Sequence, residues 1–324
     1  MTSKTVAGTV VKPIRARVFP FFIAMFGFLK KLLGGGQESA PAVARFGMDE
    51  LSRRLGMSAE ALRAVPIRYN PFQIPKRGGG MRTILAPCAE LKVVQRKILR
   101  RLLSRLKAHP CATGFEKRHS IVTNALPHVG KQVVIRLDLR DFFTSTSASR
   151  VTAYFMQIGW AADAAELLTK LCTYERSLPQ GAPTSPRLSN LVNYRLDKRL
   201  AALAESKGAT YSRYADDITF SGGAASADAQ RVNDLIHATK AIVKDEGYTL
   251  HTDKKLRISR GHDRQIVTGI VVNQKANLPR RTRRKLRAIE HRLRTRGQAT
   301  LTAAQLEGWR SLQNMIATQR SAQS

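Results

Sequence analysis

The stretch Tyr211–Ser221, YSRYADDITFS, decides the fold, because two adjacent carboxylates, Asp216 and Asp217, stand between two strand-like segments. Tyr211–Tyr214 is expected to form one strand, and Ile218–Ser221 alternates apolar and polar residues as a half-buried strand does. The sequence therefore predicts a β-hairpin with both acids at its turn. Adjacent carboxylates repel each other, and a divalent cation that takes hard oxygen ligands, above all Mg²⁺, removes this conflict. An isolated Asp-Asp pair is usually a solvated surface turn, so the context of this pair decides its meaning.

The composition points to a polyanionic partner. The chain of 324 residues carries 55 Lys and Arg against 23 Asp and Glu, a formal net charge of +32. Such an excess opposes compaction unless a polyanion is bound regularly, which favours nucleic acid over a merely basic soluble protein. With 43% hydrophobic residues the chain can bury a sizeable core in two or three subdomains. Cys88, Cys111 and Cys172 form no CxxC pair, which predicts neither disulfides nor structural zinc and fits a reducing cytoplasm.

Residues 1–47 are expected to form an N-terminal extension. The apolar run 18–29 is flanked by basic residues, and its 12 residues fall short of the ~20 that span a bilayer, so no stable transmembrane span is expected. A signal peptide cleaved near Ala44 is an alternative, against which the basic pair after the run and its distance from Ala44 weigh. We expect a flexible or membrane- or partner-associating extension that ends at the linker Gly34–Gly36, and a start of translation at Met48 stays open.

The rest of the chain predicts helices and strands in alternation. Apolar residues at helical spacing predict helices over 48–62, 91–106, 185–200 and 232–246. A basic helix pair is expected over Lys275–Arg296. Strands are expected in a hairpin over Asn70–Pro87 with its turn at Gly78–Gly80, and over 132–139 and 265–273.

A third carboxylate, Asp138, lies on the predicted strand 132–139. Ile135, Leu137 and Leu139 share one face of that strand, so Asp138 points to the other face. Strand, helix, hairpin, helix and strand, with acids on the first strand and at the hairpin turn, is the order of a polymerase palm.

The motifs around these acids resemble those of reverse transcriptases, and within them the bacterial retron type. The resemblance covers the chain from about Asp49 to its end. It rests on IRLDLRDFF at Ile135–Phe143, LPQGAPTSPRLSN at Leu178–Asn190, YADD at Tyr214–Asp217, the stretch Gly247–Lys254, NALPH at Asn124–His128 and VTG at Val267–Gly269. His251 departs from the pattern, which has Asn there in many members, so Lys254 and Lys255 both stay candidates for the lysine of that motif.

The resemblance implies an α/β (α+β) fold of the right-hand polymerase kind. Fingers with N-terminal helices are expected over 48–130, and a palm of antiparallel sheet plus helices over 131–274. A fingers insertion is expected within about 145–180, and a short basic helical thumb over 275–324.

The implied activity is RNA-directed DNA synthesis. Formation of a phosphodiester needs an activated hydroxyl and stabilisation of the departing pyrophosphate, which two Mg²⁺ ions about 3.5–4 Å apart accomplish together. Asp138 and Asp216 are the expected bridging ligands, and Asp217 supports the ion nearer the primer. Mn²⁺ is a substitute cofactor.

Several residues are expected to bind the nucleotide. Arg82 and Lys76 resemble residues of the fingers that grip the triphosphate. Lys254 is expected to protonate the pyrophosphate or only to neutralise its charge. Each of these would, in isolation, be a solvated surface charge.

The loop residues of the nucleotide site follow from the same motifs. Asp141 lies where backbone N–H groups hold the triphosphate, while its own carboxylate is equally expected to be a cap. Phe143 is expected beneath the incoming sugar, where its ring excludes a ribose 2′-OH and selects dNTPs, unless it is an ordinary core residue. Gln180 and Gly181 permit close backbone approach to the nucleotide.

Other residues are expected to bind RNA and primer. Asn124 and His128 are interpreted as RNA-binding or scaffold residues, since a lone His is more often a structural hydrogen-bonding residue. Ten Lys and Arg lie within Lys275–Arg296, which favours a thumb that contacts phosphates. The RNA- or primer-binding set is completed by Tyr214, Val267, Thr268, Gly269, Arg280, Arg281, Arg283 and Arg284.

The resemblance to retrons also implies the partners. These are a structured non-coding RNA that serves as template and primer, dNTPs, an RNA–DNA hybrid, and an effector or toxin protein encoded nearby. Priming from a 2′-OH, a branched RNA–DNA product and a role in anti-phage defence are implied as well. An intron-encoded or diversity-generating reverse transcriptase and a catalytically silent RNA-binding scaffold are the alternatives.

Overall fold

The computed structural model describes residues 46–76, 79–251, 256–297 and 299–321. The chain divides into two units, Met1–Pro41 and Ala42–Ser324, and all described residues belong to the second unit. The apolar run 18–29 and the candidate residues Lys254 and Lys255 lie outside the described residues. Among the described helices, none combines the length and the apolar composition that crossing a bilayer requires.

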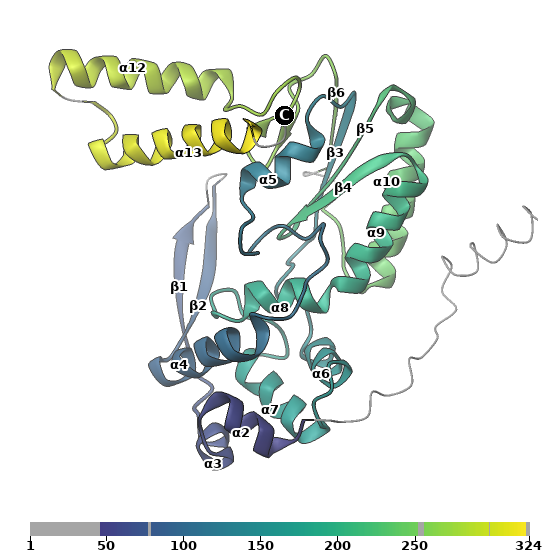
Figure 1. The fold of residues 1–324 in the computed structure, drawn as a ribbon, viewed down its shortest axis with the longest axis vertical. Coiled ribbons are helices and arrows are strands. Elements are labelled where there is room, and N and C mark those ends of the chain that lie inside the picture. The colour runs from purple at the N-terminus through teal and green to yellow at the C-terminus, as the bar shows by residue number, and fades with distance from the viewer. Residues whose placement is uncertain (1–45, 77–78, 252–255, 298, 322–324) are drawn as a thin grey trace, which may run out of the picture. The chain divides into compact units, whose positions relative to one another are not determined.

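The centre of the fold is a four-stranded antiparallel sheet with the strand order β4-β5-β3-β6. Its strands are β3 (Val133–Asp138), β4 (Ala209–Tyr214), β5 (Asp217–Gly222) and β6 (Arg257–Arg260). Helices α9 (Tyr194–Ser206) and α10 (Ala229–Asp245) lie side by side against this sheet (Figure 1). Apolar residues of both helices form one buried cluster with Ile135 and Leu137 of β3. The predicted α+β class with an antiparallel sheet is therefore confirmed.

A second buried cluster joins two helical segments that are distant in sequence. It contains residues from Leu51 to Leu103 and from Val151 to Leu191, so the segment after the first acidic strand packs on the N-terminal helices. The helices concerned are α2 (Met48–Leu55), α3 (Ala59–Arg63), α4 (Ala89–Ile98), α6 (Ala148–Gln157), α7 (Ala162–Cys172) and α8 (Ser185–Val192). Helix α4 continues as a π-helical turn, Leu99–Leu103. The limits of fingers, palm and thumb stay a prediction.

The expected N-terminal hairpin is present. Strands β1 (Tyr69–Pro75) and β2 (Met81–Pro87) pair antiparallel over their whole length. Apart from Tyr69, every residue of β1 is exposed, so the hairpin stands in solvent beyond its base.

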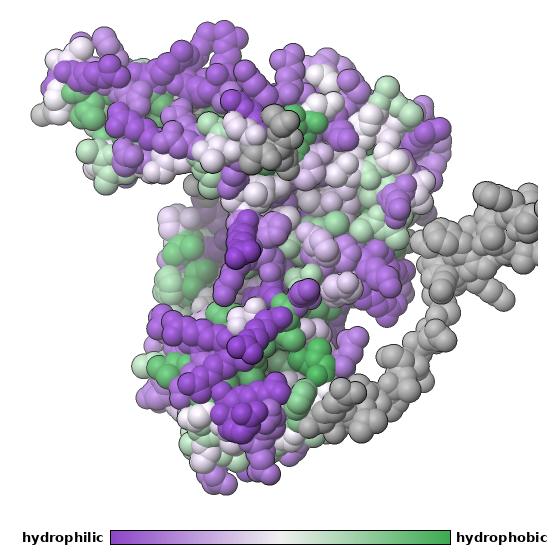
Figure 2. Space-filling model, in the orientation of Figure 1, coloured by the Kyte–Doolittle hydropathy of each residue, from purple (hydrophilic) through white to green (hydrophobic). Residues whose placement is uncertain are grey.

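The third buried cluster lies at the C-terminal end. It joins α12 (Arg280–Arg296) and α13 (Ala303–Ser321), which lie side by side in Figure 1, to the short helix α5 (Ile121–Ala125) and to strands β7 (Ile266–Val267) and β8 (Ile270–Val271). The predicted basic helix pair is wrong in part: within Lys275–Arg296 the structure has one basic helix, α12, and the second helix, α13, begins after this range and carries only Arg310 and Arg320 as basic residues. Hydrophilic side chains cover much of α12 in Figure 2. The buried residues of this helix are Leu286 and Ile289.

Two predictions of secondary structure are wrong. The expected strand 265–273 is a hairpin, because Thr268 (φ 46°) and Gly269 (φ 86°) form a two-residue turn with both φ angles positive, as type I′ turns require. The expected helix 185–200 is broken at Asn193 into α8 and α9.

Candidate active site

The three predicted acids meet at one end of the central sheet. Tyr214 pairs with Asp217 across the β4–β5 turn, which leaves Ala215 and Asp216 as its two central residues. Asp138, at the end of β3, is the cross-strand partner of Asp217. The Leu139 N–H also donates to the carbonyl oxygen of Asp216 at 2.9 Å. Backbone pairing therefore fixes both acidic segments against each other before any side chain contributes.

An arginine and a histidine lie beside the acids, of which Asp138 is buried while Asp216 and Asp217 are half-buried. An Arg136 guanidinium nitrogen lies 3.4 Å from Asp217 Oδ1. His251 Nε2 lies 3.9 Å from Asp138 Oδ1, and the His251 N–H donates to the Asp138 carbonyl at 2.8 Å. His251, which departs from the family pattern, therefore lies beside the first acid. The signal that could have placed it was its position three residues before the motif's expected lysine.

The acids fit ions that arrive with a phosphate substrate. Within the described residues, no group of three or more His, Cys, Asp or Glu side chains is gathered closely enough to hold a metal ion. Mg²⁺ in polymerases is generally held by one or two carboxylates plus substrate phosphates rather than by a cage of protein ligands alone. The oxygen donors of Asp138 and Asp217, on paired strand ends, match that mode of binding.

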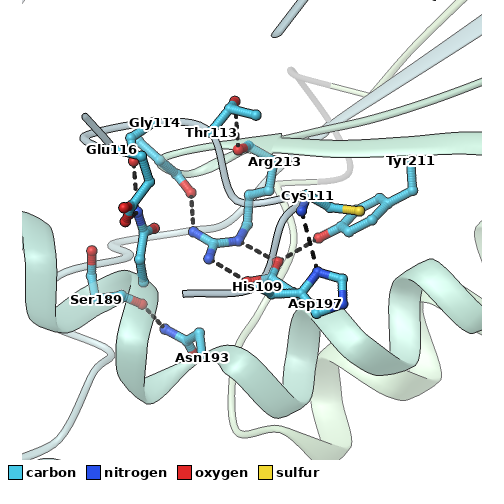
Figure 3. A network of polar contacts seen from close by, with 12 residues as sticks. His109, Cys111, Thr113, Gly114, Glu116, Ser189, Asn193, Asp197, Tyr211 and Arg213 are labelled. Atoms are coloured by element: carbon cyan, nitrogen blue, oxygen red, sulfur yellow. Dashed lines mark hydrogen bonds and ion pairs between the residues drawn. The ribbon is translucent and has the colours of Figure 1, made fainter. Parts of the chain in front are cut away.

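A buried ion pair supports the acidic turn (Figure 3). Both partners, Arg213 of β4 and Asp197 of α9, are fully buried, and two hydrogen bonds of 2.7 and 2.6 Å join them. Arg213 also donates to the carbonyl of Ala215 at 2.8 Å, while the Tyr211 hydroxyl donates to Asp197 at 2.7 Å. Burial lowers the pKa of Arg213, but the charge of Asp197 more than offsets this effect, so the pKa is raised overall. The turn is thus attached to helix α9 through one guanidinium.

Sequence reasoning missed this ion pair. The available signal was a charged residue on each element at a position whose spacing predicts burial. Asp197 precedes Leu200 and Ala204 on the same face of α9, and Arg213 follows the buried Tyr211 by two residues in β4. Two such residues of opposite charge predict a pair, although not its geometry.

The loop 111–116, which sequence reasoning also missed, lies against the β4–β5 turn. The Thr113 N–H donates to the Arg213 carbonyl at 2.9 Å, and the Arg213 N–H donates to the Cys111 carbonyl at 2.8 Å. A Cβ on Gly114 would lie 2.5 Å from the backbone nitrogen of Ala215, so only glycine allows this approach. Asn190 Nδ2 fixes the same segment by donating to the Gly114 carbonyl at 2.6 Å. Figure 3 shows the loop beside β4 and α9.

Asn124 and His128 are buried, which supports the scaffold alternative over direct contact with RNA. Asn124 Oδ1 accepts a hydrogen bond of 2.6 Å from the Thr113 hydroxyl. The His128 ring nitrogens lie 2.7 Å from Ser221 Oγ of β5 and 2.8 Å from Ser212 Oγ of β4. Burial, followed by the charge of Lys131, lowers the pKa of His128 to about 3, so its ring is neutral at pH 7. His128 therefore joins the two strands of the acidic hairpin.

In the segment Leu178–Asn190, Gln180 and Gly181 lie directly against strand β2. The Leu85 N–H donates to the Gln180 carbonyl at 2.8 Å. Gly181 has φ 136°, and a Cβ there would lie 2.5 Å from the Leu85 carbonyl oxygen. The expectation that Gly181 allows close approach of a nucleotide is corrected in this respect: its missing Cβ makes room for the backbone of β2.

The other expected nucleotide residues lie at the surface or near it. Asp141 is exposed, and its backbone has a left-handed conformation (φ 47°). Its carbonyl accepts a hydrogen bond from the Ser145 N–H at 2.7 Å. Phe143 is half-buried, with its ring centroid 5.7 Å from that of Phe142. Arg82 and Lys76 are exposed on and beside the β1–β2 hairpin.

The expected RNA-binding residues of the C-terminal region divide into two groups. Arg280, Arg281, Arg283 and Arg284 are exposed on α12. Val267 is fully buried, which removes it from any contact with RNA. The Thr268 hydroxyl donates to the Ile121 carbonyl at 2.6 Å, so the β7–β8 turn is fixed to helix α5, and Gly269 is exposed at its tip.

The comparisons with known proteins identify a family over the region that contains these acids. The family model described as reverse transcriptase (RNA-dependent DNA polymerase) matches residues 74–263. The retron Mx65 reverse transcriptase of Myxococcus xanthus is 39% identical over 281 residues, which cover 77% of this chain and 65% of that protein. The retron Ec86 reverse transcriptase of Escherichia coli is 37% identical over 256 residues, which cover 76% and 78%.

Among solved structures, telomerase from Candida albicans in complex with a fragment of telomeric RNA gives a TM-score of 0.48 at 10% identity. The alignment covers 72% of this chain and 49% of the telomerase chain.

Proposed function

The chain belongs to the retron-type reverse transcriptases, a family of RNA-directed DNA polymerases, and we propose that it copies a structured non-coding RNA into single-stranded DNA that stays joined to that RNA. The observation that carries the proposal is the cross-strand pairing of Asp138 with Asp217, next to Asp216 in a two-residue turn. A structural hairpin has no reason to gather three carboxylates at one strand end, where they repel one another.

Asp138, Asp216 and Asp217 would hold two Mg²⁺ ions, with Mn²⁺ as a substitute. When bound, such ions lower the pKa of an attacking hydroxyl and stabilise the charge of the leaving pyrophosphate. Arg136 offsets part of the charge of Asp217 and so keeps the acids compatible at one strand end. The ring of Phe143 bars a ribose 2′-OH, and Arg82 and Lys76 meet the triphosphate from the exposed hairpin.

The RNA is recognised through its backbone and shape rather than through base edges. A net charge of +32 and the exposed arginines of α12 supply phosphate contacts that carry no sequence information. The similarity to retron reverse transcriptases implies that the DNA strand begins at a 2′-OH inside the folded RNA. An internal hydroxyl reaches the acids only if the fold of the RNA delivers it, so the RNA must be structured. We further propose that this branched product acts in anti-phage defence in the cytoplasm, together with an effector protein that is encoded nearby.

The test uses DNA recovered from cells that express the chain together with its native RNA. The proposal predicts DNA that stays covalently joined to RNA until a debranching enzyme or alkali separates them. An Asp216→Asn variant should yield no such product, whereas Asp234→Asn, on the exposed surface of α10, should yield it normally. If the wild-type protein yields only free DNA, the protein is a reverse transcriptase without retron priming. If it yields no DNA, the scaffold alternative stands.

A further inference from the structure

Phe115 is an exposed aromatic residue in a constrained backbone conformation. The residue is 45% exposed, and its φ angle is 64°, in the left-handed region that bulky residues rarely adopt. Such a conformation persists only where the neighbouring structure imposes it, and it concentrates at functional sites. The next question is therefore what holds Phe115 and what it faces.

The residues on both sides of Phe115 are fixed. Gly114 lies against the backbone of the acidic turn, and its carbonyl accepts a hydrogen bond from Asn190. Asn190 Nδ2 also donates to Glu116 Oε1 at 2.8 Å, and Glu116 forms an ion pair with Arg187. The exposed ring is thus presented by a rigid loop rather than by a freely moving one.

The ring of Phe115 lies close to the rings of two residues assigned to the reacting nucleotides. Its centroid is 6.1 Å from that of Phe143, expected beneath the incoming sugar, and 6.5 Å from that of Tyr214. Tyr214 precedes Asp216 by two residues and pairs with Asp217. Phe115 therefore forms an aromatic cluster with Phe143 and Tyr214 next to the acidic turn, and Phe115 is the exposed ring of this cluster.

We propose that Phe115 contacts the nucleotides at the reacting end, packing its exposed ring on a base or sugar there. Aromatic rings stack on bases of any sequence, because every base has a π-face, which suits an enzyme that must copy all four bases. A Phe that only covered its two neighbours would not need an aromatic ring exposed to solvent, since an aliphatic side chain covers them equally well. The proposal rests on the proposed polymerase function.

Two kinds of variant test this contact on an annealed primer with a 3′-OH. Phe115→Leu removes the aromatic ring and keeps the apolar volume, and Phe115→Tyr keeps the ring. We expect the Leu variant to raise the KM for dNTP, or the Kd for primer–template, about tenfold. The first result assigns the contact to the incoming nucleotide, and the second assigns it to the primer–template end. The Tyr variant should stay within about twofold of wild type in both constants.

The control is Tyr194→Ala. Tyr194 is 45% exposed as well, but its ring contacts His109 (centroids 5.3 Å apart) instead of the aromatic cluster next to the acidic turn, so both constants should stay unchanged. Unchanged KM and Kd in Phe115→Leu overturn the inference, as does an equal loss in the Leu and Tyr variants. A lowered kcat with both constants unchanged also overturns it, because the residue then acts only through the turn. Absence of synthesis by the wild-type protein would instead refute the proposed function.

Discussion

Two of the antiparallel hairpins, β4–β5 and β1–β2, are held in opposite ways. In β4–β5 most residues are buried. Arg213 of β4 links the turn to Asp197 of α9, and His128 forms hydrogen bonds to a serine on each strand. In β1–β2 all of β1 beyond Tyr69 is exposed, and the hairpin relies on backbone pairing and on the contact of β2 with Gln180. Carboxylates that share metal ions need fixed positions, whereas a hairpin that grips a substrate needs accessible side chains. Substitutions should therefore cost stability in the first hairpin and substrate binding in the second.

The largest effect is expected from the ion pair beneath β4–β5. Asp197→Ala leaves the Arg213 guanidinium buried without its partner, which should lower the free energy of unfolding by about 3–5 kcal/mol. Urea unfolding measures this loss. Glu50→Ala, which removes exposed ion pairs with Arg53 and Arg54, should hardly change it. Equal effects of the two substitutions would remove the distinction between the hairpins.

A smaller effect is expected from His128 and depends on pH. Its folded-state pKa of about 3 lies below the unfolded value near 6.5, so only the unfolded chain binds the proton between these limits. The contribution of a neutral His128 is complete above pH 6.5 and declines as the pH falls toward 3, by about 2 kcal/mol at pH 5. Urea unfolding at several pH values should show a weaker acid destabilisation for His128→Gln. His262→Gln, whose side chain is 77% exposed, should behave as wild type, and a shared slope would argue against the buried neutral ring.

The smallest effect on stability is expected in β1–β2. Arg82 is exposed, so Arg82→Ala should leave the free energy of unfolding within about 0.5 kcal/mol of wild type. Loss of a charged contact to the triphosphate should nevertheless raise the KM for dNTP about tenfold. Steady-state kinetics measure this, with Arg63→Ala on the exposed face of α3 as the matched control. A large loss of stability without a change in KM would assign Arg82 a structural role.

The contrast also explains what the sequence could predict. Short-range alternation and turn composition correctly predicted both hairpins and the position of Asp216 and Asp217 at the β4–β5 turn. The position of Asp138 beside them followed from motif order, since strand pairing depends on contacts across about 80 residues that periodicity alone does not encode. Gly181 was expected to face a nucleotide. A glycine indicates that some group approaches the backbone closely, but the sequence does not show that this group is the backbone of β2.

Other errors have equally local causes. Val267-Thr268-Gly269 was assigned to one strand because Thr-Gly is a weaker signal for a type I′ turn than Asn-Gly. The break at Asn193 was missed because its apolar neighbours keep helical spacing on both sides. The Arg213–Asp197 pair and the Gly114 contact join segments that only tertiary packing brings together.

The most direct measurement of the central claim is extension of an annealed primer by Asp216→Asn beside Asp234→Asn. Asn keeps the shape of Asp216 but removes the charge that holds an ion, so the variant should fold, bind RNA and synthesise DNA at below about 1% of the wild-type rate. Asp234→Asn should synthesise DNA at the wild-type rate. Synthesis by Asp216→Asn well above that level, with RNA binding intact, would contradict the account of the acidic turn as the catalytic centre.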